Sequence, residues 1–130
     1  MIWISLAFAG DAYDRLKLRD GASCEGLDVA ELLVLAEADI APTYVPMRAA
    51  DCLLASHATD PIVAEHARAW VREERWLGLG LLVGRQIDRF PLEAALAIAA
   101  DAQDARVVRR LGESIRPEVR AVVEKGPTSR

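Results

Sequence analysis

Apolar residues recur along this chain at intervals of three and four positions, the spacing of one face of an α-helix. The clearest example is a helix predicted over residues 61–75. Asp60 suits its N-cap and Pro61 its first position, because Asp accepts hydrogen bonds from unpaired N–H groups and Pro has no N–H to leave unpaired. The predicted apolar face contains Val63, His66, Ala67, Trp70 and Val71, and the opposite face contains Arg68, Arg72 and Arg75.

The same spacing predicts helices along the rest of the chain, with Pro, Gly and Asp at their ends. Glycines weaken the segment 77–84, so a helix there must pack closely against a neighbour through them. In the segment 105–115, Val107, Val108, Leu111 and Ile115 are expected to face inward. A tight connection at 58–60 predicts a helical hairpin there. The expected helices are one or two in the first twenty residues, then 28–38 with a capping box at Asp28 and Glu31, 46–57, 61–75, 77–84, 92–103, 105–115 and one from Pro117.

The chain of 130 residues is therefore predicted to be all-α, either stacked helical hairpins or an irregular helical bundle. Its length and a hydrophobic fraction of 52% fit one domain, expected over residues 1–124, with a disordered tail at 125–130. No apolar run reaches the ~18 residues that span a bilayer. Segment 1–10 has no Lys or Arg before its short apolar run, so we interpret it as part of the mature chain and expect a cytoplasmic protein.

Two segments align when the chain is shifted by 44 residues, so that Asp60 falls on Asp104 and Ala50 on Ala94. Each reads as helix, short turn with Asp, then helix, in the sequences DPIVAEHA (60–67) and DARVVRRLG (104–112). Over residues 46–116 the chain thus resembles HEAT-type helical repeats. It departs from that pattern at Ala64, where the family prefers Arg, and at Arg109, which is one position late. The resemblance implies a short right-handed array that binds proteins, sometimes nucleic acid, and has no catalytic residues.

The charge is distributed unevenly. The chain has a net charge of −4, but residues 1–65 carry −7 and residues 66–130 carry +3. Such a field steers a partner of opposite charge. We therefore expect a protein-interaction module, such as an adaptor, a small regulatory subunit or an immunity-type neutraliser, whose acidic half meets a basic partner through Glu31, Glu37 and Asp39.

Two further surfaces are candidates for partner binding. The apolar stretch within residues 77–100 is hydrophobic all round, which predicts self-association or a partner contact there, with Leu82 and Ile98 as contact residues. An alternative is nucleic-acid binding through an Arg-rich helix face, formed by Arg68, Arg72, Arg75 and Arg109.

Few residues in the sequence indicate a catalytic, metal or cofactor site in this chain. Its two cysteines and two histidines have no zinc-ligand spacing, and the sequence predicts no metal and no cofactor. In the cytoplasm Cys24 and Cys52 would stay reduced. A last alternative is a small-ligand-binding or enzymatic helical domain, with a pocket near His66, Trp70 and Trp76.

Overall fold

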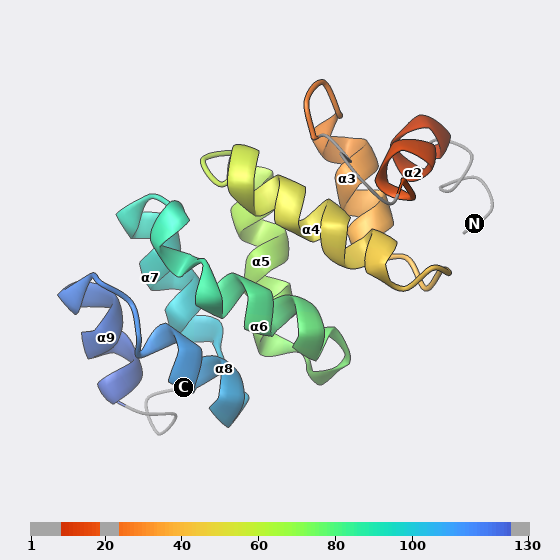
Figure 1. Ribbon diagram of the computed structural model, residues 1–130. Coiled ribbons are helices and arrows are strands. Elements are labelled where there is room, and N and C mark those ends of the chain that lie inside the picture. Colours follow the sequence, from red (N-terminus) through yellow and green to blue (C-terminus); the bar gives the residue numbers. More distant parts are fainter. Residues whose placement is uncertain (1–8, 19–23, 126–130) are drawn as a thin grey trace. The chain divides into compact units, whose positions relative to one another are not determined.

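A computed structural model describes residues 9–18 and 24–125 of the chain (Figure 1). These residues form α-helices and short 3₁₀ helices, and no strand occurs among them, so the all-α prediction is confirmed. None of the helices in these ranges is both long and apolar enough to cross a membrane. The predictions for segment 1–8 and for the tail beyond Lys125 concern residues outside the described ranges.

The chain divides into two compact units, residues 1–57 and residues 58–130. The single domain over residues 1–124 stays a prediction, as does the hairpin around 58–60, which spans the boundary between the units. The first unit contains α2 (Gly10–Leu16), α3 (Val29–Ala36) and α4 (Tyr44–Ser56). The second contains α5 (Pro61–Arg72), η1 (Glu74–Trp76), α6 (Leu77–Arg85), η2 (Ile87–Arg89), α7 (Leu92–Asp101), α8 (Ala105–Leu111) and α9 (Pro117–Glu124).

In the first unit, α3 packs against α4 through fully buried leucines, and α2 contacts both helices. Polar side chains fix α2 in place: the Arg48 guanidinium donates to the Leu16 carbonyl at 2.7 Å, and the Tyr44 hydroxyl donates to the Lys17 carbonyl at 2.8 Å. Asp28 occupies the N-cap position of α3 in extended conformation, but its side chain makes no capping hydrogen bond. The capping box expected at Asp28 and Glu31 is therefore absent.

Cys24 and Cys52 form a disulfide in the first unit, with their Cα atoms 5.5 Å apart. The prediction that both cysteines stay reduced is wrong. The disulfide forms because of the way the chain packs around α4. Cys52 is buried on this helix, and the segment before α3 passes it at a distance that suits a disulfide. The 28-residue separation of the two cysteines carries no local signal for this pairing.

The second unit consists of two layers of parallel helices (Figure 1). In one layer α5 packs against α7 and α7 against α9; in the other α6 packs against α8. Arg68 of α5 pairs with Asp101 near the carboxyl end of α7 at 2.6 Å, and the Arg116 side chain, before α9, donates to the Phe90 carbonyl, before α7, at 2.6 Å. Like ends of neighbouring helices therefore lie together.

The stacking register differs from the sequence alignment. Arg68 and Asp101, which face each other across α5 and α7, are 33 residues apart rather than 44. The alignment instead matches the start of α5 in one layer with the start of α8 in the other. These two starts share a real local feature, because Asp60 accepts from Ile62 N at 3.0 Å and Asp104 from Arg106 N at 2.7 Å. The predicted N-caps are confirmed.

Helix α8 ends at Leu111, earlier than predicted, and Ile115 is 80% exposed instead of facing inward. The cause is a polar junction with η2. Asp88 accepts hydrogen bonds from the Ser114 hydroxyl and from Ile115 N, the latter at 3.1 Å. The Ser114 oxygen in turn accepts from Arg116 N at 3.1 Å. These bonds satisfy backbone groups that a longer helix would have used, so the chain turns into α9.

Replacing Asp88 with alanine is expected to lower the free energy of unfolding by about 2 kcal/mol, the cost of leaving a buried hydroxyl without its partner. Ser114 is 4% exposed, so its hydroxyl has little access to solvent that could replace the lost acceptor. The isosteric Asp88→Asn variant keeps one acceptor oxygen and should lose less. Urea denaturation of the two variants checks this, and equal stability of D88A and the wild type would contradict it.

Candidate functional site

A groove of about 330 Å³ runs between α5 and α7, near their amino-terminal ends. Its α5 wall consists of Pro61, Ala64, Glu65 and Arg68, which share one helix face at intervals of three and four residues. Small side chains line the opposite wall because α7 is rich in alanine. The α7 side of the groove is composed of Pro91, Glu93, Ala94 and Ala97.

Carboxylates dominate the charged groups of the groove, which are Asp60, Glu65, Glu93 and Arg68. Glu65 and Glu93 are exposed and form no ion pair or hydrogen bond with any residue that the structure describes. The one guanidinium, that of Arg68, donates to Asp101 at 2.6 Å, and this hydrogen bond and the negative charge of Asp101 raise its pKa above the usual value. The groove is therefore apolar along its walls and negative at its rim.

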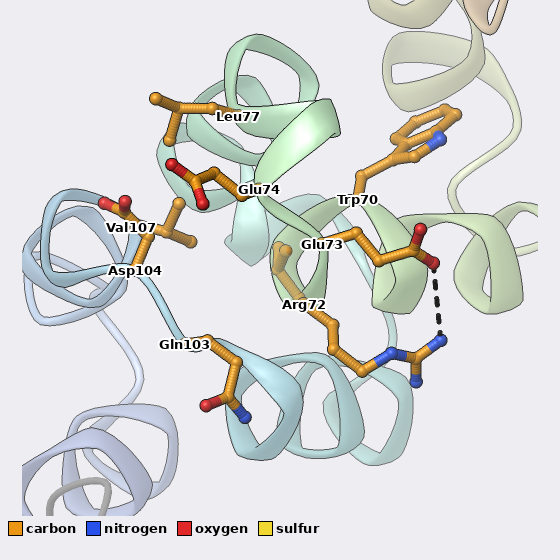
Figure 2. Close-up of a pocket in the computed structure, with 9 residues that line it drawn as sticks. Trp70, Arg72, Glu73, Glu74, Leu77, Gln103, Asp104 and Val107 are labelled. Carbon is orange, nitrogen blue, oxygen red and sulfur yellow. Dashed lines mark ion pairs between the residues drawn. The ribbon is translucent and has the colours of Figure 1, made fainter.

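A second hollow, of about 340 Å³, lies between the carboxyl end of α5, η1 and the connection from α7 to α8 (Figure 2). A backbone hydrogen bond from Gln103 N to the Val71 carbonyl, at 3.3 Å, holds the α7–α8 connection against α5. Figure 2 shows the Trp70 indole pointing away from Asp104 and Gln103, and Arg72 paired with Glu73. The Arg72 and Glu73 side chains are 4.0 Å apart. The residues that line this hollow include no His, Cys or Ser, so a Ser–His or Cys–His pair is absent from its lining.

Asp104 at the edge of this hollow has a pKa lowered to about 2. The main cause is the hydrogen bond that its carboxylate accepts from the Arg106 side chain, followed by the one from Arg106 N. Both bonds favour the ionised form. The unfolded value is about 3.9, so this group's contribution to stability is complete above that pH and is lost as the pH falls toward 2.

The Asp104 carboxyl is expected to titrate with a midpoint near pH 2, which carbon-detected NMR can follow. In the Arg106→Gln variant the backbone bond remains while the charged partner is lost. The midpoint should then rise part of the way toward the ordinary value. A midpoint near 4 in the wild-type protein would contradict the assigned pairing.

The acidic residues predicted to meet a partner lie in the first unit. Glu31 on α3 and Glu37 at its end are half-buried, whereas Asp39 is exposed in the connection to α4. The two apolar contact residues predicted in the second unit are placed inside it: Ile98 is fully buried and Leu82 is 8% exposed. Neither side chain presents a surface to a partner, because α7 packs between α5 and α9, and α6 packs against α5 and α8.

The arginines of the predicted nucleic-acid-binding face contact several different residues. Arg68 and Arg72 share Asp101, at 2.6 and 3.7 Å. Arg75 pairs with Glu73 at 2.9 Å and lies over the Trp76 ring, 4.7 Å from its centre. Arg109 lies on α8, in the other layer. A third hollow, of about 320 Å³, brings Arg68 and Arg72 together with Glu65, His66 and Ala69.

Little in the described ranges resembles a catalytic or metal centre. No group of three His, Cys, Asp or Glu residues there is arranged to hold a metal ion. Cys52 is held in the disulfide, so its sulfur is not a free nucleophile. Of the three residues proposed for a ligand pocket, Trp70 lines the second hollow and His66 the third, while Trp76 lines none of the three hollows.

Sequence reasoning missed the groove between α5 and α7. Its alanines on α7 belong to the apolar stretch predicted to be hydrophobic all round, and Glu93 was not considered. The usable signal was the combination of Pro61 and Pro91, each next to the start of a helix, with alanines spaced along both helices. Comparison with known proteins adds no second line of support, because no family model, curated protein or solved structure matches this chain.

Proposed function

We propose that this chain is a protein–protein interaction module with no chemistry of its own, and that the groove between α5 and α7 is its docking surface. The observation that carries the proposal is the groove itself: two parallel helices present alanine and proline walls to solvent. Concave apolar surfaces of this kind accept segments of partner proteins. The acidic residues of the first unit, Glu31, Glu37 and Asp39, would add long-range attraction for a basic partner.

The array proposed from the resemblance to HEAT-type repeats is supported by the layering of the second unit. Helix α5 packs against α7 and α7 against α9, while α6 packs against α8, so stacking continues through successive helices. Arrays built in this way use extended concave surfaces for binding. Self-association through residues 77–100 stays a prediction, although Leu82 and Ile98 are no longer its contact residues.

A tagged chain compared with its Ala97→Trp variant tests the docking surface. The indole would fill the groove, because Ala97 lines it. Ala100→Trp is the matched control, since Ala100 is exposed on the same helix but does not line the groove. We expect a stoichiometric protein partner to be retained by the wild type and A100W and lost with A97W. Equal retention by all three chains would contradict the proposal.

A second candidate function is binding of nucleic acid or another anion, favoured by the hollow that contains Arg68, Arg72 and His66. Phosphate contacts would give an affinity that falls steeply with salt, and Arg72→Glu should reduce it. The absence of a mobility shift with duplex or single-stranded DNA at low salt would dismiss this function.

The cytoplasmic location stays a prediction without support from the cysteines. Disulfides persist mainly in oxidising compartments. The Cys24–Cys52 bond therefore favours an oxidising environment for the working protein.

A further inference from the structure

We propose, on the basis of the docking function proposed above, that the α5–α7 groove selects a linear segment of a partner protein that carries Lys or Arg. The apolar walls would take the aliphatic stem of such a side chain, and the carboxylates of Asp60, Glu65 and Glu93 would take its cationic head. The proposal names the class of partner, which the docking function alone leaves open.

The groove carries a net negative charge. It contains three carboxylates and one guanidinium, and that guanidinium already donates to Asp101. Glu65 and Glu93 form no close ion pair among the residues described. The charge of Glu65 acts on Arg68 at longer range, and the groove keeps an excess of negative charge. An acidic segment entering this groove would meet like charges, which costs free energy and suppresses wrong partners.

The walls of the groove are apolar. Ala64, Ala94 and Ala97, with Pro61 and Pro91, present methyl and ring carbons and no side-chain hydrogen-bonding group. Lys and Arg combine a long apolar stem with a terminal charge, and they bury the stem on apolar surface while the head stays polar. A groove with apolar walls and a carboxylate rim matches both halves of that side chain, whereas an aliphatic residue would use only the walls.

Selection of random linear peptides displayed on phage against the immobilised full chain tests the proposal. The Ala97→Trp variant serves as the counter-selection, so that only peptides that need the open groove are kept. We expect enrichment of peptides with Lys or Arg beside small or aliphatic residues. Groove-dependent peptides that are neutral or acidic would overturn the charge selection while leaving the docking function intact. No groove-dependent enrichment would overturn the docking function itself.

Charge reversal of the rim then tests the residues assigned to it. Glu93→Lys should weaken binding of a fluorescein-labelled enriched peptide by about fivefold, a size expected when an exposed ion pair is replaced by repulsion. Glu118→Lys is the matched control. Glu118 lies in the first turn of α9, as Glu93 lies in the first turn of α7, and the two variants have the same net charge. Equal weakening by both variants would show a general charge effect and overturn the role of the rim.

Discussion

Replacing Gly80 with alanine is expected to lower the free energy of unfolding by about 2 kcal/mol, the usual cost of forcing an extra carbon into a packed interior. A Cβ atom at Gly80 would lie 2.6 Å from the Trp70 carbonyl oxygen. That oxygen belongs to the backbone of α5, and the Trp70 side chain is almost fully buried, so neither group can yield without moving the helix. Chemical denaturation followed by circular dichroism measures the change.

Gly78→Ala is the matched control in the same helix. Gly78 is exposed, so the added methyl group should act mainly through helix propensity, which favours alanine by up to about 1 kcal/mol. The two substitutions are therefore expected to have opposite signs. A neutral or stabilising G80A variant would contradict the close packing of α6 against α5.

Loss of the Cys24–Cys52 disulfide is expected to lower the free energy of unfolding by about 3.5 kcal/mol, as for a loop of this length. The bond restricts the unfolded chain and ties the segment before α3 to α4. Cys24→Ser is the better variant, because Cys24 is half-exposed whereas Cys52 is buried on α4. Thermal and urea unfolding, with and without dithiothreitol, measure the loss.

The control for this prediction is the chain lacking both sulfurs, with Cys24→Ser and Cys52→Ala together. Dithiothreitol should destabilise the wild type and leave this double variant unchanged. Thiol labelling followed by mass spectrometry should find no free thiol in the unreduced, denatured wild type. Two labelled thiols in that sample, or equal stability of C24S and the wild type, would contradict the disulfide.

Local features of the fold were predictable from the sequence because they depend on neighbouring residues. The Asp60 and Asp104 caps, the first-turn Pro61 and the apolar face around Trp70 all follow from short-range rules, and the structure confirms them. The close packing of α6 through its glycines was also predicted, since an apolar helix weakened by Gly needs a near neighbour, and it holds for Gly80 and Gly84 but not for the exposed Gly78.

Features that depend on distant parts of the chain were not predictable in this way. The packing of α5 on α7, which pairs Arg68 with Asp101, is set by several elements, and so is the pairing of Cys24 with Cys52. Ile98 illustrates the consequence for site prediction. Its helix is hydrophobic on more than one face, which suggested that Ile98 is an exposed contact residue. Helices α5 and α9 pack on both sides of α7, however, and bury Ile98.

Site-specific photocrosslinking in living cells tests the central claim, docking of a partner protein in the groove, most directly. A photoreactive amino acid at position 93 would lie at the rim, and the same residue at position 118 would lie on α9 outside it. The account predicts one protein crosslinked efficiently from position 93 and not from position 118, and lost when Ala97→Trp is added. Crosslinks of equal yield from both positions, or a crosslink that survives filling of the groove, would contradict it.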